Sequence, residues 1–156
     1  MISIRKAIDT DLPQLAAIRG SDPLSVANWI NRIAAYINGT HHPQKALAGR
    51  VVFVAVFDEQ VVGFIAGHLT RRFECHGELQ WINVINEQQH KGIAGMLLKK
   101  LASWFLSYDA KQICVNCEPD NIVALTFYKK HGAETLNNHW LVWKNIGMVN
   151  PDYRKN

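Results

Sequence analysis

Apolar side chains recur at two different spacings along the chain, and the change of spacing separates expected helices from expected strands. Between residues 24 and 37, and again between 92 and 107, they return every three or four positions, as on the buried face of a helix. Short apolar runs rich in Val, Ile, Phe and Trp lie between polar turns, which predicts strands. The expected strands cover residues 2–6, 51–57, 61–72, 79–85, 112–117 and 139–146.

Two further helices are predicted from signals at their ends. Asp9, Asp11 and Pro13 are typical of a helix start, and this helix is expected to run to about residue 19. A later helix is expected over residues 121–131, followed by Gly132. Strands come first, and strand, helix, strand, helix and strand follow. This order indicates an α+β fold, an α/β sandwich with a mixed sheet covered on both faces.

The length of 156 residues suits a single domain. We place this domain at residues 1–147 and expect 148–156, a polar stretch, to be a mobile C-terminal tail. The N-terminus lacks the apolar stretch of a signal peptide, and polar residues such as Asp58 and His68 interrupt the longest apolar run. A cytoplasmic protein that does not cross a membrane is therefore expected.

Cysteine usage and charge limit the classes of function. Three cysteines without paired spacings favour a reducing compartment. Cys114 and Cys117 lie three positions apart in an expected strand, so their side chains should point to opposite faces. We therefore interpret both, and Cys75, as structural residues and expect no metal site. The net charge of +4 comes from dispersed Lys and Arg residues, so nucleic acid is not an expected partner.

The clearest chemical signal lies where the strand ending near residue 85 is followed by the helix from 92. Residues 89–94 read Gln-His-Lys-Gly-Ile-Ala and form a turn that opens into this helix. The first N–H groups of a helix have no partner within it, and the positive end of the helix dipole lies there. Such a turn can bind an anion, and Gly92 would let phosphates approach the backbone.

Two motifs in this order resemble those of the GCN5-related N-acetyltransferase (GNAT) superfamily. The first, Gln-x-x-Gly-x-Ala at residues 89–94, resembles the family's acetyl-CoA pyrophosphate loop. The second, Asn121-x-x-Ala124-x-x-x-Tyr128, continues as Lys-Lys-His-Gly-Ala to residue 133. The resemblance implies a mixed, mainly antiparallel sheet of about seven strands with about four helices. It also implies that the sheet is splayed between its fourth and fifth strands.

The resemblance implies acetyl-CoA as the acyl donor and assigns the residues that would bind it. The pantetheine arm would lie along the fourth strand, where an N–H near Ile82 would face the thioester oxygen. Gln89 and Ala94 replace the Arg and the third Gly that are common in the family, but the main chain would make the phosphate contacts. The implied cofactor-binding residues are Ile82, Asn83, Val84, Gln89, His90, Lys91, Gly92, Ile93, Ala94, Gly95 and Asn121.

The resemblance further implies two catalytic residues, Tyr128 and Glu78. The Tyr128 hydroxyl would donate to the leaving thiolate, and a buried packing tyrosine is the alternative. Glu78 would deprotonate the acceptor amine, and a solvated strand-end carboxylate is the alternative. Glu78 precedes Ile82 by roughly 13 Å along a straight strand, so a bulge, an inserted substrate or a water relay would be required.

Other bases remain open at this point. The candidates are His68, His76, His41 and His42. The branch that acetylates ribosomal protein N-termini has its glutamate on the fifth strand, where this chain has Asn116. Asparagine cannot accept that proton, so this branch's mechanism is not expected here.

These observations predict an N-acetyltransferase that transfers an acetyl group from acetyl-CoA to a primary amine by direct attack in a ternary complex. The amine would belong to a small molecule or a peptide. A non-catalytic acyl-CoA-binding sensor or regulatory domain is the alternative. Trp29, Tyr36 and residues 41–45 lie where the superfamily builds its acceptor pocket, but their types do not identify the amine. A homodimer is compatible with the resemblance.

Overall fold

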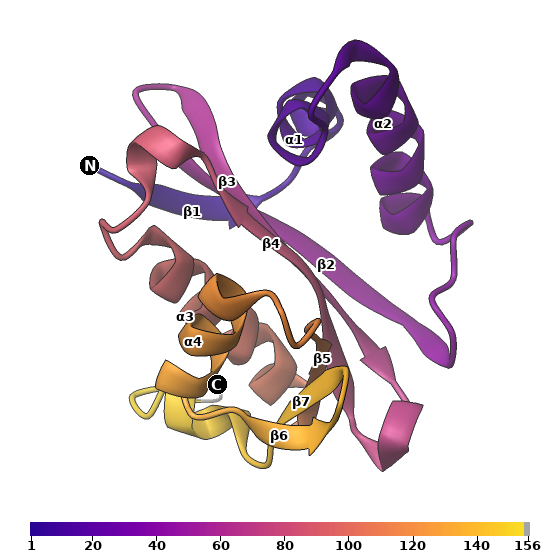
Figure 1. Ribbon diagram of the computed structural model, residues 1–156, viewed down its shortest axis with the longest axis vertical. Helices are drawn as coiled ribbons and strands as arrows, with labels where there is room; N and C mark the ends of the chain where they lie inside the picture. The colour runs from indigo at the N-terminus through magenta and orange to yellow at the C-terminus, as the bar shows by residue number, and fades with distance from the viewer. Residues whose placement is uncertain (155–156) are drawn as a thin grey trace.

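A computed structural model describes residues 1–154, which form one seven-stranded sheet flanked by helices (Figure 1). Most expected elements are present within a few residues of their predicted bounds. The strands are β1 (Ser3–Lys6), β2 (Ala46–Phe57), β3 (Gln60–Thr70), β4 (Gly77–Val84), β5 (Ile113–Asn116), β6 (Glu134–Asn137) and β7 (Trp140–Trp143). The helices are α1 (Leu12–Arg19), α2 (Pro23–Asn38), α3 (Ile93–Ser107) and α4 (Ile122–Lys130).

The sheet has the strand order β1-β2-β3-β4-β5-β7-β6, and every neighbouring pair is antiparallel except β4 and β5. These two strands pair in parallel only where Gly77, Glu78 and Leu79 face residues 113–115. The expected mixed, mainly antiparallel sheet that opens between its fourth and fifth strands is therefore confirmed.

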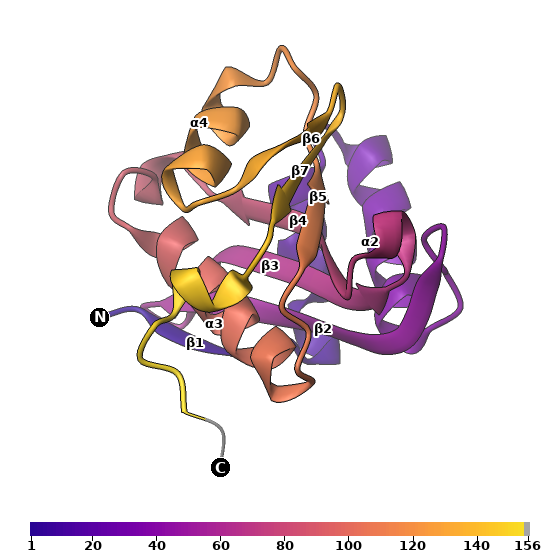
Figure 2. The same ribbon diagram turned by 90° about the horizontal axis from the view of Figure 1, so that it is seen from below.

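The helices cover both faces of this sheet. Figure 1 shows α1 and α2 on one side of strands β1 to β4 and α3 and α4 on the other. In Figure 2 the β5–β7–β6 part of the sheet lies between α2 on one side and α3 and α4 on the other. The apolar stripe of α3, with Leu97, Leu101 and Phe105 all fully buried, packs on the sheet as its periodicity predicts.

A close approach of α3 to the sheet depends on a glycine in β4. A Cβ atom added at Gly77 would overlap the ring of Phe105 and crowd Ile113. The absence of a side chain at this position lets the helix lie directly over the short stretch where β4 and β5 pair. The start of the gap between the two strands is thus fixed by core packing.

The second core lies between the sheet and the first two helices. Leu15 of α1 and Ile33 and Tyr36 of α2 are completely buried against Phe64 and Trp81. Asp22 begins α2, since its side chain accepts a hydrogen bond from the Ser25 N–H at 2.9 Å. Gly39, with φ of 78°, ends the helix.

Two elements differ from the expected pattern. Strand β6 was not expected from periodicity, because all four of its side chains are exposed and it therefore lacks an apolar alternation. Strand β2 begins at Ala46, five residues before the expected start at residue 51. The start of the expected tail packs on the domain, since Asn150 is 8% exposed and donates to Ser103 on α3 at 2.6 Å. Residues 155–156 of that tail lie outside the described residues.

Among residues 1–154, none of the helices has the length and apolar character needed to cross a lipid bilayer.

Candidate acyl-transfer site

The edge of β4 that faces β5 has free backbone groups beyond Leu79, where the two strands diverge. Near the end of β4, the Ile85 N–H donates to the Val62 carbonyl on β3 at 2.9 Å. Because backbone groups alternate in direction along a strand, those of Ile82 and Val84 point the other way, into the gap. The gap thus presents the N–H and C=O of Ile82 and the N–H of Val84 as unpaired groups that an amide-containing ligand could pair with.

The turn between β4 and α3 is held by the side chain of Gln89. Its Nε2 donates to the Val84 carbonyl at 3.0 Å and to Asn86 Oδ1 at 3.1 Å. Gly92 follows with φ of 81° in the left-handed region, and no side chain caps the helix that begins at Ile93. The first N–H groups of α3 therefore have no capping partner, as the predicted anion site requires.

The other residues of this loop surround the bare helix start. His90 and Lys91 are exposed, and Lys91 Nζ donates to Gln88 Oε1 at 3.3 Å. Gly95, in the first turn with Ala94, faces the end of α4, since a Cβ there would lie 3.5 Å from His131 Cε1. The Ile93 side chain is buried, so only its backbone could meet a ligand.

A bulge in β4 decides which of its side chains share a face. The register with β3 shifts between Leu79 and Trp81, which leaves Gln80 as the extra residue. As a result Leu79 packs in the core under α3, whereas Trp81 packs in the core under α1 and α2. Glu78, Trp81 and Asn83 therefore all face the first two helices. A bulge, one of the three arrangements that would let Glu78 act as the base, is thus present.

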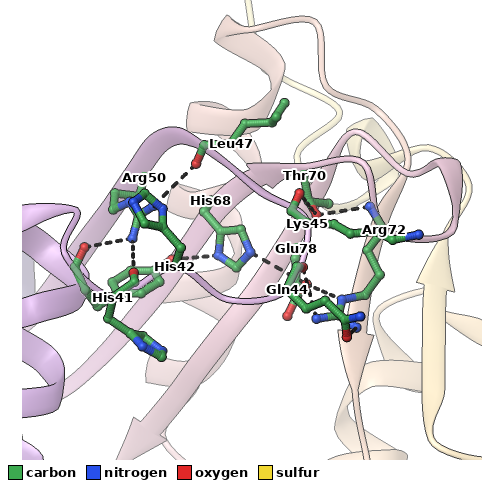
Figure 3. Close-up of polar contacts among 11 residues, drawn as sticks. His41, His42, Gln44, Lys45, Leu47, Arg50, His68, Thr70, Arg72 and Glu78 are labelled. Atoms are coloured by element: carbon green, nitrogen blue, oxygen red, sulfur yellow. Dashed lines mark hydrogen bonds and ion pairs between the residues drawn. The ribbon is translucent and has the colours of Figure 1, made fainter.

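Glu78 lies inside the protein rather than at a solvated strand end. It is 5% exposed, and Arg72 Nε donates to its Oε1 at 3.0 Å (Figure 3). The Arg72 guanidinium also stacks 4.6 Å from the ring centroid of Trp140. The alternative of a solvated carboxylate is therefore wrong, and Glu78 belongs to a buried charge network.

His68 extends this network toward α2. Its ring is completely buried, with Nε2 3.6 Å from Glu78 Oε1 and Nδ1 2.9 Å from the Tyr36 hydroxyl. Figure 3 shows the His68 ring directed toward Glu78. A carboxylate paired with an arginine attracts an N–H, so the consistent tautomer has the proton on Nε2 and the tyrosine donating to Nδ1. Burial raises the pKa of Tyr36, which keeps this donor protonated.

The other candidate histidines are held by different groups. His76 Nδ1 accepts from the Gln112 N–H at 3.2 Å, and His42 Nδ1 accepts from Arg50 Nη2 at 3.0 Å. Burial, followed by the positive charges of Arg32 and Arg50, lowers the pKa of His41. Of the four histidines, only His68 contacts Glu78.

Tyr128 has a buried ring but an available hydroxyl. The residue is 6% exposed, and its ring packs edge-on against Trp143 with centroids 5.8 Å apart. Burial, and to a lesser degree Cys117, raises the pKa of the phenol, whereas Arg19 lowers it. Within residues 1–154 the hydroxyl makes no hydrogen bond. The phenol therefore stays protonated at neutral pH and has its proton free to donate.

Two asparagines with predicted binding roles also have structural ones. Asn121 caps α4, because its Oδ1 accepts from the Ala124 N–H at 3.2 Å. Asn83, on β4, accepts at Oδ1 from Arg19 Nη1 at 2.7 Å. In both residues the side-chain amide nitrogen remains as a donor for a ligand.

Sequence reasoning missed the arginines beside the gap. Arg19 lies at the end of α1 and Arg32 on α2, and both guanidinium groups stack on Trp29. Neither residue belongs to a recognisable motif, so their convergence on Trp81 became visible only once α1 and α2 were placed over β4. The bulge between Leu79 and Trp81 was also missed, because both residue types are typical of a regular strand.

The three cysteines are buried, as predicted. Cys114 packs with Cys75 in one cluster, whereas Cys117 packs in the core under α3, so the first and last cysteines of the Cys-x-x-Cys sequence do face opposite sides. Across residues 1–154 no group of three or more His, Cys, Asp or Glu side chains is arranged to hold a metal ion.

Residues 25–133 match the sequence model of the acetyltransferase (GNAT) family. No curated protein matches the sequence. Several solved structures share the fold. The PaiA N-acetyltransferase from Thermoplasma acidophilum in complex with coenzyme A is 19% identical, with a TM-score of 0.70 over 93% of this chain and 99% of that one.

Two more structures extend this comparison. A GNAT-family acetyltransferase from Staphylococcus aureus is 16% identical, with a TM-score of 0.69 over 94% of this chain and 99% of that one. A ribosomal-protein-alanine N-acetyltransferase from Brucella melitensis is 22% identical, with a TM-score of 0.63 over 90% of this chain and 94% of that one. At these identities the likeness shows the fold.

Proposed function

The chain belongs to the acetyltransferase (GNAT) family, and on that premise we propose that it transfers an acetyl group from acetyl-CoA to a primary amine by direct attack in a ternary complex. The observation that carries this proposal is the gap between β4 and β5 beside the uncapped start of α3. One ligand that has both amide groups and a pyrophosphate could use both features.

The backbone of the gap and the helix start would share the binding of acetyl-CoA. Ile82 and Val84 offer strand-like hydrogen bonds to the pantetheine arm, and the N–H groups from Gly92 to Gly95 offer theirs to the phosphates. His90 and Lys91, exposed in front of the helix, add hydrogen-bond donors, and Lys91 adds a positive charge. Asn121, at the start of α4, would contact the arm with its side-chain amide.

Acetyl-CoA supplies an activated thioester, and the protein would supply proton transfers and an oxyanion donor. The Ile82 N–H would stabilise the negative charge that develops on the thioester oxygen. Tyr128 would donate a hydrogen bond or proton at the sulfur, for which its protonated hydroxyl is suited. Glu78 would accept the amine's proton through water, because its burial beside Arg72 argues against direct contact with the amine.

Ligand-dependent thermal stability tests the proposed donor. Coenzyme A should raise the melting temperature, because a ligand that binds only the folded state stabilises it. ATP and NAD serve as controls that offer phosphates without a pantetheine arm. Stabilisation by ATP or NAD but not by coenzyme A would contradict the proposal.

The sensor alternative makes a different prediction. Both functions require binding of acetyl-CoA, but only the transferase releases free thiol when an amine is present. Coenzyme A binding without thiol release from any amine of a broad panel would favour the sensor.

A further inference from the structure

Two arginines and two tryptophans form a surface beside the gap, which we name the arginine shelf: Arg19, Trp29, Arg32 and Trp81. The two indole rings meet edge to face, with centroids 5.5 Å apart and planes at 86°. The Arg19 and Arg32 guanidinium carbons lie 4.5 and 4.8 Å from the Trp29 ring centroid. They lie 5.9 and 5.8 Å from the Trp81 ring centroid. Both guanidinium groups therefore lie against the same pair of indole rings.

The positive charge of the shelf is not neutralised within residues 1–154. The ion pairs among these residues involve other basic side chains, and neither Arg19 nor Arg32 has a carboxylate within pairing distance. Arg19 Nε is buried and makes no hydrogen bond. Burial, followed by the charge of Arg32, lowers the pKa of Arg19. The attraction of a bound anion would compensate for the lost hydration of Arg19 and reduce the repulsion between the two arginines.

The shelf lies where an acceptor would have to approach the thioester. Arg19 is hydrogen-bonded to Asn83 on the open part of β4, and its positive charge lowers the pKa of the Tyr128 phenol. On the outer side, Trp29 and Arg32 line a hollow of about 320 Å³ with Ser25, Asn28 and Asp22. The Asp22 carboxylate there accepts a bond from the Ser25 N–H, so it already caps α2.

We propose that the acceptor is a small amino acid, whose carboxylate binds between Arg19 and Arg32 while its amine points toward the gap. This inference rests on the proposed acetyl transfer. Guanidinium groups bind carboxylates through paired, charge-assisted hydrogen bonds, and Trp29 and Trp81 offer apolar faces to the acceptor's side chain. A polyamine is disfavoured, because it would bring more positive charge to two uncompensated arginines.

Matched acceptor pairs test the role of the carboxylate. Each free amino acid of a panel is compared with its own carboxamide, and putrescine represents amines without a carboxylate. The expected kcat/KM is about tenfold or more higher for the amino acid than for its amide. The amine of the amide has the lower pKa, so more of it is in the reactive neutral form. A preference for the free amino acid would therefore have to come from its carboxylate and not from the reactivity of its amine.

Arg32 is the residue to substitute, since its exposed side chain stacks on the rings but makes no hydrogen bond or ion pair within residues 1–154, and its loss should not unfold the protein. Arg32→Gln should raise the KM for the amino acid about tenfold while leaving the KM for the matched amide and for acetyl-CoA unchanged. Lys111→Gln, which removes an exposed charge two residues before β5, is the control and should leave all three constants unchanged.

Each other outcome has a distinct meaning. Equal kcat/KM for amino acids and amides, a preference for putrescine, or an equal effect of Arg32→Gln on both members of a pair would overturn the carboxylate site. Acetylation of no amine at all would instead contradict the proposed function on which the inference rests.

Discussion

At the scale of single residues, the two proposed catalytic side chains differ in whether the protein already binds their polar atoms. Tyr128 has a hydroxyl without a hydrogen bond in the described chain, whereas Glu78 is held by Arg72 and faces His68. The first arrangement leaves a proton to donate at the gap. The second fixes a carboxylate close to the expected acceptor side, where it can take up a proton through a relay.

Removal of the Tyr128 hydroxyl should affect turnover rather than binding. Tyr128→Phe keeps the ring that packs against Trp143 but removes the proposed donor to the sulfur. Because a thiolate leaves without much help near neutral pH, we expect kcat to fall by about tenfold to a hundredfold, with an unchanged Kd for coenzyme A. Tyr108→Phe, at a tyrosine that is 55% exposed, is the control. An unchanged kcat in Tyr128→Phe would exclude the donor role.

The raised pKa of Tyr128 also makes a prediction about pH. A phenol whose pKa lies above its ordinary value of about 10 keeps its proton throughout the usual assay range. Tyr128 should therefore cause no loss of kcat as the pH rises to 9. A fall of kcat in this range that disappears in Tyr128→Phe would contradict the assignment.

Glu78→Gln should lower turnover by removing the proposed base while keeping the shape of the side chain. Arg72 retains a hydrogen bond to the Gln44 carbonyl, so the fold should persist. We expect kcat to fall about a hundredfold, because the proposed base is missing, and the pH dependence of kcat/KM to follow the ionisation of the amine alone. Glu74→Gln, at an exposed carboxylate nearby, is the control. The same pH profile in Glu78→Gln as in the unchanged protein would remove Glu78 from this role.

At the scale of elements, the start of α3 illustrates what pattern can predict. The apolar run before residue 85 predicts a strand, Gly92 predicts a turn, and the apolar stripe of α3 predicts a helix. All three are present in that order, and the helix start is uncapped. The bulge at Gln80 could not be predicted, because neither Leu79 nor Trp81 departs from the composition of a regular strand. Nor could β6, whose pairing with β7 does not depend on buried side chains.

Gly92→Ala tests the helix start, with Gly39→Ala as a matched control. Both glycines have φ near 80° and open space around the missing Cβ, so each substitution should cost about 1 kcal/mol of stability through backbone strain. Only Gly92→Ala places a methyl group where phosphates are expected, so it alone should weaken coenzyme A binding, by roughly tenfold. Equal affinities of the two variants for coenzyme A would contradict the phosphate site.

At the scale of the whole molecule, the two cores hold α1 and α2 over β4 and thereby create contacts between distant parts of the chain. Arg19 reaches Asn83 across 64 positions of sequence. Tyr36 reaches His68 in the same way, from α2 to β3. The sequence predicted the fold and the donor loop, because both depend on local patterns. It did not predict the arginine shelf, because that surface depends on tertiary packing alone.

The start of α1 is fixed by a charge pair that should make stability depend on pH. Arg5 donates two hydrogen bonds to Asp11, at 2.7 and 3.0 Å, and the Ile8 N–H donates a third at 2.8 Å. The bond from Arg5 is the main reason that the pKa of Asp11 is lowered. Because the pKa of Asp11 is lower in the folded state, its charge stabilises the fold at any pH above about 3.9, the pKa in the unfolded chain. This stabilisation is lost as the pH falls below that value toward the pKa of the folded state.

Asp11→Asn should therefore lower the free energy of unfolding by about 1 to 2 kcal/mol at pH 7, as measured by urea denaturation. The difference from the unchanged protein should shrink as the pH falls below about 4. Asp9→Asn, at an exposed neighbouring carboxylate, should have little effect at either pH. A difference for Asp11→Asn that stays constant with pH would show that the charge is not responsible.

Two-substrate kinetics test the central claim, acetyl transfer to an amine in a ternary complex. Free thiol is measured while acetyl-CoA and an amine are both varied, and the acetylated amine is identified by its mass. We predict amine-dependent thiol release, with reciprocal plots that converge because both substrates are bound before transfer. Coenzyme A binding without amine-dependent thiol release would contradict acetyl transfer, and parallel plots would contradict direct attack.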